Sequence, residues 1–219
     1  LTADIKLNGE NKVLNDDGSL TSNADTLVKW TPIGKYANPF KGEFDGGGYT
    51  ISGLYINDSS KNYVGLFGCV ENGGTVKNVN VTDSYVSGNI SVGGICGSNQ
   101  NGNRAGLVLN CHNTGKVSGK NRVGGVCGGG DDSTNCYYLD TSAETSKGGT
   151  AKTAAEFKSD YVAYLLQQAL NDAAPGTTAA QVWGRRIGTD DYPVLSSDAA
   201  YTVYKPLKSA LGKHRPLKL

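Results

Sequence analysis

Short apolar runs, separated by glycine, asparagine and serine, recur through the middle of the chain. The clearest copies are Tyr63-Val-Gly-Leu-Phe-Gly68, Val92-Gly-Gly-Ile-Cys-Gly97 and Val123-Gly-Gly-Val-Cys-Gly128. The glycine that opens the last four residues of each copy recurs after 29 and then 31 residues. These segments are rich in Val, Ile, Tyr and Gly, which is typical of strands and turns rather than helices. A period near this length predicts a solenoid.

Two more motifs repeat with a similar period. One is Tyr85-Val-Ser-Gly88 with Lys116-Val-Ser-Gly119, and the other is Lys77-Asn-Val-Asn80, Leu109-Asn-Cys-His112 and Thr134-Asn-Cys-Tyr137. Inward residues of each coil would stack on the next coil at about 4.8 Å, while glycines would permit positive φ or close backbone approach at corners. We therefore predict an all-β solenoid, a right-handed parallel β-helix of a few coils with two or three short strands per coil.

The flanks of the repeat predict caps, because the open ends of a solenoid otherwise invite aggregation. Residues 1–48 are interpreted as an N-terminal strand cap with the first strand, in which Leu1–Leu7 alternates as a strand. Trp30 and Phe40 are expected to cover the end of the core. Residues 49–149 then form the coils.

The pattern changes after residue 149. Thr153 and Glu156 are spaced as a capping box, Tyr161–Leu170 has apolar residues at helical spacing, and Val182–Gly188 and Tyr192–Leu195 predict one or two short strands. We predict that residues 150–204 form a helix-containing C-terminal cap on the last coil, so that residues 1–204 are one domain. Residues 205–219 form a basic tail or linker, with its charge on Lys205, Lys208, Lys213, His214, Arg215 and Lys218.

Charge is nearly balanced, with 21 basic and 20 acidic residues. No overall field therefore draws the chain to nucleic acid or to an acidic membrane surface. No apolar run approaches the roughly 18 residues that a membrane span needs. The 31 glycines do not follow the triplet pattern of collagen. We expect no nucleic-acid partner and no membrane span in this fragment.

Five cysteines fall in the repeat region: Cys69, Cys96, Cys111, Cys127 and Cys136. With only His112 and His214 beside them and no C-x-x-C pair, a zinc site lacks ligands at workable spacing. Cys96 and Cys127 occupy equivalent positions, as do Cys111 and Cys136. Parallel side chains of stacked neighbours suit disulfide geometry poorly, so the pattern favours a ladder of buried thiols; disulfides are the alternative.

Carboxylates are candidate catalytic or calcium-binding groups, because β-helix enzymes place acids from adjacent coils on one face. The candidates are Glu43, Asp45, Asp83, Asp131, Asp132 and Asp140. They do not stack in register, so we interpret them as turn residues. Asp16–Ser19 lacks the spaced acids of a calcium loop, and Gly128–Gly130 lacks the Lys-Ser/Thr of a phosphate loop. We expect no catalytic, metal or cofactor site.

Tyrosine is abundant, with 12 residues. Six lie in or near the predicted coils: Tyr36, Tyr55, Tyr63, Tyr85, Tyr137 and Tyr138. An exposed row of them would suit binding of a sugar or a protein; the alternative is that several point inward or belong to caps. The pattern alone leaves the ligand-binding residues unknown.

The repeats resemble the GLUG-motif proteins, which are named for the Gly-Leu-apolar-Gly core. Trp30–Gly34 and Phe40–Leu54 resemble the segment that precedes such repeats in bacterial surface proteins, and Asp191–Leu195 resembles an ending found in secreted proteins of gut Firmicutes. The resemblance implies a module of a larger cell-wall-attached protein. In streptococcal proteases that cut immunoglobulin A, such repeats lie outside the metallopeptidase domain. This chain has no His-Glu-x-x-His, so that activity does not carry over.

Fold and resemblance together favour a non-catalytic, secreted or cell-surface module. It would act in adhesion, by binding a host glycoprotein or glycan, or as a rigid spacer. We expect a monomeric part of a larger multidomain chain. The alternative is a carbohydrate-active β-helix, either a polysaccharide lyase or a glycoside hydrolase. Three exposed acids on neighbouring coils would favour the enzyme, an exposed tyrosine patch without such acids would favour binding, and a featureless polar surface would favour a spacer.

Overall fold

The computed structural model describes residues 1–71, 73–100, 105–130, 133–144, 147–173, 182–185, 190, 192–196, 204–208 and 214–218. The chain divides into two compact units, Leu1–Ala151 and Lys152–Leu219. The first unit contains the repeats, and the second contains the two α-helices.

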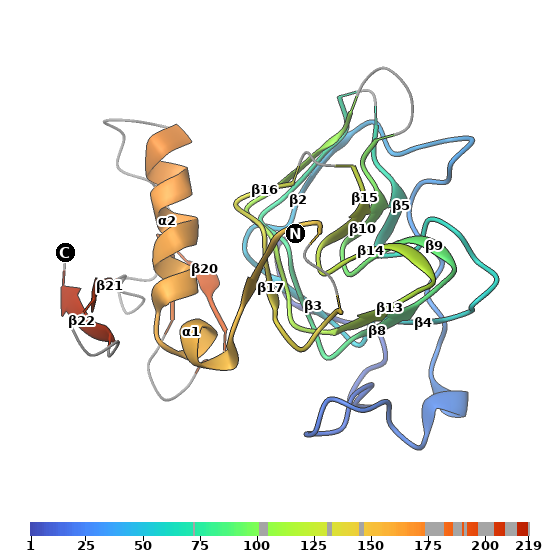
Figure 1. Ribbon diagram of the computed structural model, residues 1–219, viewed down its shortest axis with the longest axis horizontal. Coiled ribbons are helices and arrows are strands. Elements are labelled where there is room, and N and C mark those ends of the chain that lie inside the picture. The colour runs from blue at the N-terminus through green and yellow to red at the C-terminus, as the bar shows by residue number, and fades with distance from the viewer. Residues whose placement is uncertain are drawn as a thin grey trace. The chain divides into compact units, whose positions relative to one another are not determined.

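The first unit is a solenoid of short parallel strands (Figure 1). One coil consists of β9 (Ile90–Gly93), β10 (Cys96–Ser98), β11 (Leu107–Leu109), β12 (His112–Asn113) and β13 (Lys116–Ser118). The coil before it contains β5 (Phe67–Cys69), β6 (Thr75–Lys77), β7 (Asn80–Thr82) and β8 (Tyr85–Ser87), and the coil after it contains β14 (Asn121–Gly124), β15 (Cys127–Gly129), β16 (Ser133–Thr134) and β17 (Tyr137–Leu139). These coils thus have four or five strands each rather than the predicted two or three.

Earlier strands begin the same ladders. They are β1 (Ile5–Lys6), β2 (Glu43–Asp45), β3 (Thr50–Ser52) and β4 (Tyr55–Asn57). The sheets have the orders β1-β3-β7-β12-β17-β18, β15-β10-β5, β16-β11-β6-β2, β13-β8-β4 and β14-β9, where β18 is Thr150–Lys152. Strands of one sheet lie over one another in Figure 1, as β4, β8 and β13 do. This parallel stacking confirms the β-helix-like solenoid.

The strand register confirms the three repeated motifs. Phe67, Cys96 and Cys127 are paired along one ladder. Lys77 pairs with Leu109, and Leu109 pairs with Thr134. The third ladder joins Tyr85 to Lys116, and it continues upstream to Tyr55, a copy that the sequence comparison missed. Each coil therefore places matching residues at matching positions.

Corners with positive φ are formed both by glycine and by other residues. Asn78, Asn110 and Asn135 have φ of 54°, 51° and 52° and make one corner of three successive coils. Asparagine adopts this left-handed conformation more readily than most residues. Glycine also supplies positive φ, as at Gly53 (77°) and Gly73 (88°), so this part of the prediction is confirmed and asparagine shares the role.

The motif glycines serve close packing instead. Gly94 and Gly125 lie outside the left-handed region. A Cβ at Gly94 would lie 2.4 Å from the Asn113 side chain, and a Cβ at Gly125 would lie 2.0 Å from Cγ of Tyr138. The second half of the glycine prediction, close approach, is thus confirmed at these positions.

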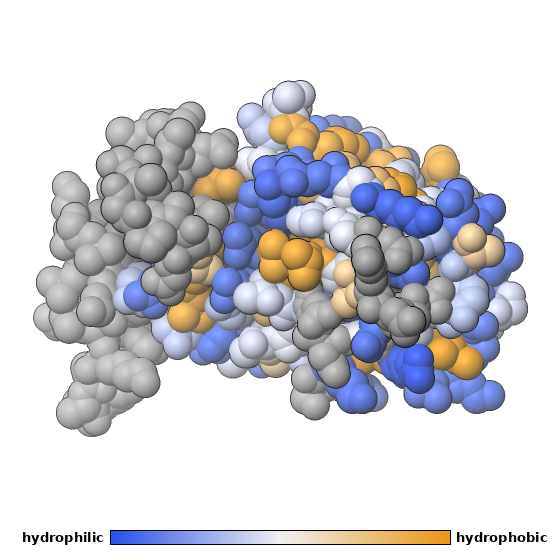
Figure 2. Space-filling model, turned by 90° about the horizontal axis from the view of Figure 1, so that it is seen from above, coloured by the Kyte–Doolittle hydropathy of each residue, from blue (hydrophilic) through white to orange (hydrophobic). Residues whose placement is uncertain are grey.

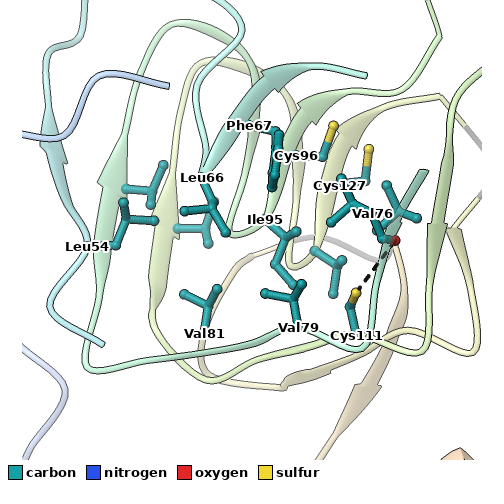
Figure 3. Close-up of a cluster of buried hydrophobic side chains, with 14 of the residues drawn as sticks. Leu54, Leu66, Phe67, Val76, Val79, Val81, Ile95, Cys96, Cys111 and Cys127 are labelled. Carbon is teal, nitrogen blue, oxygen red and sulfur yellow. Dashed lines mark hydrogen bonds between the residues drawn. The ribbon is translucent and has the colours of Figure 1, made fainter. Parts of the chain in front are cut away.

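The core of the first unit lies inside the coils (Figure 3). Leu54, Leu66, Phe67, Val76, Val79, Val81 and Ile95 are among its buried side chains. Phe40 and Phe44 each place a ring centroid 5.2 Å from that of Phe67. Trp30 and Phe40 are half-buried and pack against the core, while their role in covering its end stays a prediction.

The second unit begins with α1 (Ala154–Lys158) and α2 (Tyr161–Ala173). Glu156 N–H donates to Thr153 Oγ1 at 3.2 Å, and Thr153 N–H donates to Glu156 Oε2 at 2.9 Å, so the predicted capping box is present. β19 (Val182–Gly184) and β20 (Val194–Ser196) form an antiparallel pair, at the two predicted strand positions. No helix in the described ranges is long and apolar enough to cross a bilayer.

The predicted basic tail, residues 205–219, overlaps the antiparallel strands β21 (Tyr204–Lys208) and β22 (His214–Lys218). Its role as a linker stays a prediction. That residues 150–204 cap the last coil, and that the solenoid is right-handed, also stay predictions.

Candidate functional site

A groove of about 490 Å³ lies on the first unit, between the segment that precedes β2 and the segment around the end of β4. We call it the aromatic groove. Its lining is Lys29–Pro32, Gly34–Tyr36, Ile56–Asp58 and Lys61–Val64. Backbone pairing holds its walls in place: Trp30 N–H donates to Tyr55 O at 2.8 Å, and Ile33 N–H donates to Leu66 O at 3.1 Å. The Trp30 indole N–H also donates to Leu66 O, at 3.0 Å.

A tyrosine pair dominates the groove. The ring centroids of Tyr36 and Tyr63 are 5.0 Å apart, with 32° between the ring planes. Tyr36 is 54% exposed, whereas Tyr63 is half-buried. Burial raises the pKa of Tyr63, with a smaller contribution from Tyr36, so its phenol stays protonated at neutral pH and can donate a hydrogen bond.

Charged groups surround this pair. Lys29, Lys35 and Lys61 line the groove and are exposed. Asp58 accepts hydrogen bonds from the Ser60 hydroxyl at 2.6 Å and from Ser60 N–H at 3.0 Å. These bonds, followed by the charges of Lys61 and Lys29, lower the pKa of Asp58. The carboxyl is therefore ionised at neutral pH.

The other four candidate tyrosines do not extend the patch. Tyr55, Tyr137 and Tyr138 are buried. Tyr85 is half-buried and lies 6.3 Å from Tyr55 between ring centroids. The N-terminal segment covers this second pair, because Val13 and Leu27 form a small cluster with Tyr55 against which Tyr85 packs. The predicted row of tyrosines thus reduces to the pair in the groove.

Apolar surface elsewhere is scattered. In the face of the molecule that Figure 2 shows, apolar residues (orange) form separate patches among hydrophilic ones (blue). Among the described residues, the exposed large apolar side chains are Ile5, Val28, Tyr36 and Leu107. Of these, only Tyr36 lines the groove.

The candidate carboxylates have local structural partners. Asp83 accepts hydrogen bonds from Val13 N–H at 3.2 Å and Leu14 N–H at 2.8 Å, which fastens the N-terminal segment to the coil. Asp45 accepts from Gly47 N–H at 2.8 Å and from the Asn78 amide at 3.0 Å. Burial opposes its ionisation, but these bonds and the nearby lysine prevail and lower the pKa of Asp45.

Lys77 pairs with Glu43 at 3.0 Å and with Asp45 at 3.6 Å. Asp140 is exposed, and Asp131 and Asp132 lie outside the described residues. In the described part of the chain, no group of three or more His, Cys, Asp or Glu side chains is placed to hold a metal ion. Glu43, Asp45 and Asp83 therefore serve as turn and ladder residues.

The five cysteines are buried free thiols. In Figure 3 the sulfur atoms of Cys96 and Cys127 point the same way from paired strands. Cys111 and Cys136 direct their thiols to backbone carbonyls, at 3.1 Å from Leu109 O and 3.4 Å from Val108 O. Burial raises the pKa of Cys69 to about 12 and raises those of Cys96 and Cys136 well above the usual value.

We expect these thiols to react very slowly while the chain is folded. Thiolate is the reactive species, and burial suppresses it. At about pH 8, where an exposed cysteine reacts readily, a disulfide reagent should label the native chain at least about 100-fold more slowly than the chain in denaturant. All five thiols should then react without reductant. Fewer than five in denaturant would indicate disulfides instead of the ladder.

Comparisons with known proteins support the repeat assignment. Residues 88–118, which include β9–β13, match the GLUG motif. Over 58 residues the chain is 45% identical to a protein of Evansella cellulosilytica whose name describes a Gly-rich membrane protein, covering 26% of this chain and 7% of that protein. Over 78 residues it is 37% identical to halomucin of Haloquadratum walsbyi, covering 36% of this chain and 1% of halomucin. No solved structure matches the chain.

The chain is thus a repeat protein that contains a GLUG motif. Its matched segments span only a small part of each relative. The assignment to gut Firmicutes and to a cell wall stays a prediction.

The charged residues of the groove were missed by the sequence analysis. Lys29, Lys35, Asp58 and Lys61 belong to no repeated motif. A further feature emerges only from the strand register of the structure: Tyr63 sits at a left-handed corner, with φ of 57°, which Ser91 and Arg122 occupy in the next coils. An aromatic residue at a corner otherwise occupied by polar residues marks a departure from the repeat.

Proposed function

We propose that the chain is a non-catalytic adhesion module of a longer surface protein, and that it binds glycan or glycoprotein in the aromatic groove. The observation that carries this proposal is the Tyr36–Tyr63 pair, which places one exposed ring in a groove of ligand size. Aromatic rings with polar edges suit ligands that are apolar on one side and hydrogen-bonding on the other.

Two observations support the module and its location. The matched segments cover 7% and 1% of the two relatives, which fits one part of a much longer chain. The name of one relative describes a membrane protein, which fits a place at the cell surface. Stacked coils are also rigid enough to act as a spacer, and this second role is compatible with binding at one side.

The carboxylates argue for binding rather than hydrolysis or elimination. A glycosidase needs a protonated acid with a raised pKa beside a second carboxylate. Asp58, which lines the groove, has a lowered pKa and is hydrogen bonded to Ser60. Asp83 and Asp45 are occupied by backbone N–H groups elsewhere on the coil.

A glycan and glycoprotein array, combined with a reducing-sugar release assay on the same polysaccharides, tests the proposal. We expect binding without release. Tyr36→Ala should weaken binding at least about tenfold, because truncation of a central aromatic contact typically costs more than 1 kcal/mol. Leu107→Ala, which also removes an exposed apolar side chain but lies outside the groove, should bind as the parent does.

Two other results have clear meanings. Release of sugar that is lost in an Asp58→Asn variant would make the chain an enzyme. Absence of both binding and release would leave the spacer role alone.

A further inference from the structure

Three lysines share the aromatic groove with the tyrosine pair. Lys29 and Lys35 come from the segment before β2, and Lys61 comes from the loop after β4. The whole chain has a formal net charge of only +1. The concentration of positive charge in this groove is therefore local and does not reflect the overall composition.

These lysines differ in their pairing from four lysines elsewhere in the chain. Lys6, Lys12, Lys77 and Lys152 each form an ion pair with a nearby carboxylate. Within the described ranges, no ion pair within 4 Å is formed by Lys29, Lys35 or Lys61. The acid that lines the groove, Asp58, is held by Ser60. Three lysines against one aspartate leave the lining positive.

The backbone of the groove is already hydrogen bonded. Tyr63 N–H donates to Ile90 O at 2.8 Å, and Val64 N–H donates to Ser91 O at 3.1 Å. On the other wall, Trp30 N–H and Ile33 N–H are used in the same way. An extended peptide that binds by strand addition needs free backbone groups. The groove instead offers aromatic rings, ammonium groups and amides, which suit a sugar.

We propose that the aromatic groove binds an acidic oligosaccharide, one that carries carboxylate or sulfate groups. This inference rests on the proposed adhesion function and names its ligand class. The Tyr36 and Tyr63 rings contact the sugar, and Lys29, Lys35 and Lys61 interact with its anionic groups. Asp58 disfavours an anionic group on its own side of the groove and so restricts the orientation of the ligand.

The test uses pairs of sugars that differ in charge. Trigalacturonic acid is compared with its methyl ester, and sialyllactose with lactose, by titration calorimetry on the full chain. At least one acidic sugar should bind with a Kd about tenfold lower than its neutral partner, as expected for a few exposed ion pairs. Raising the salt to about 0.5 M should remove most of this preference, because exposed charges are screened.

Single and double variants test which residues cause the preference for the acidic sugar. A Lys35→Gln/Lys61→Gln variant should lose the preference for the acidic sugar while keeping its fold. Lys41→Gln makes the same charge change at an exposed lysine outside the groove, and it should retain the preference. Tyr36→Ala should weaken binding of acidic and neutral sugars alike.

The remaining outcomes separate this inference from the proposed function. Equal binding of acidic and neutral sugars, abolished by Tyr36→Ala, would overturn the acidic ligand and leave the adhesion module standing. Binding of a polyglutamate peptide but of neither sugar pair would also overturn it, in favour of a protein ligand. Failure of all three kinds of probe, together with a silent array, would overturn both.

Discussion

Replacing Gly125 with alanine should destabilise the first unit by roughly 3 kcal/mol or more. The added Cβ would lie 2.0 Å from Cγ of Tyr138 and 2.3 Å from Cδ2, inside van der Waals contact. Tyr138 is 1% exposed and stands in a packed core, so the ring has little room to move. The Asn113 amide donates to Gly125 O at 2.8 Å, so a backbone shift would also disturb this bond.

Thiol exposure in urea measures this effect selectively, because all five buried cysteines belong to the first unit. Gly42→Ala is the matched control: its Cβ would meet only the far edge of the Phe40 ring, at 3.3 Å. It should change stability by less than about 1 kcal/mol. The Gly125→Ala/Tyr138→Ala double variant should be less destabilised than the sum of the single variants, since the methyl group enters space that the ring has left. Additive losses would show that Tyr138 is not the source.

The sequence was sufficient to predict the solenoid and most of its register. Phe67, Cys96 and Cys127 stand at the same place in copies of one motif, and the structure pairs them. This succeeded because a stacked coil must place like residues over like residues to fill the same space. The capping box at Thr153 and the helix after it were predictable for a different reason, since both depend on local spacing alone.

The alignment failed by one residue just before the first motif glycine. The sequence copies match Tyr63 with Val92, whereas the structure pairs Val64 with Val92. The second copy has two successive glycines, Gly93 and Gly94, where the first has only Gly65. Glycine accommodates an extra backbone residue at little steric cost, so the chain absorbs the difference there. Pattern matching has no means to detect such a shift.

The candidate site was the least predictable feature. One of its walls comes from the segment around Ile33, which joins the coil at Phe67 through an isolated bridge and without the repeated motif. Which tyrosines are exposed also depends on the N-terminal segment. This segment buries Tyr55, and its sequence lies outside the repeat. Residues that define the groove therefore became visible only once nonrepeating segments were placed in space.

Replacing Arg185 with methionine should destabilise the second unit more at neutral pH than in acid. The Arg185 guanidinium lies 3.4 Å from Asp160 Oδ1, and both side chains are less than a tenth exposed. It also donates to the carbonyls of Asp190 and Lys158. Loss of one partner leaves a buried charge without compensation, which costs about 3 kcal/mol. We expect a loss of that size at about pH 7 and a smaller one, about 1–2 kcal/mol, at about pH 4.

The direction of this pH dependence follows from the pKa of Asp160. Burial raises its pKa above the ordinary 3.8, and Arg185 opposes the rise. A carboxyl whose folded pKa is raised favours folding while it is protonated, and that contribution disappears as pH rises from 3.8 through the folded value. Without Arg185 only the effect of burial is left, so the pKa moves further upward and the penalty at neutral pH grows. Protonation in acid removes the unpaired charge and leaves the lost hydrogen bonds as the remaining cost.

Trp183 is buried in the second unit, so its fluorescence in a Trp30→Phe background follows unfolding of that unit. The Asp160→Asn/Arg185→Met double variant is the control. Asparagine tolerates the left-handed backbone of this position, where φ is 63°, and it cannot ionise. Compared with the Asp160→Asn single variant, the double variant should lose the same stability at both pH values. An equal loss at both pH values in Arg185→Met itself would show that packing and carbonyl contacts, rather than the Asp160 charge, account for the role of Arg185.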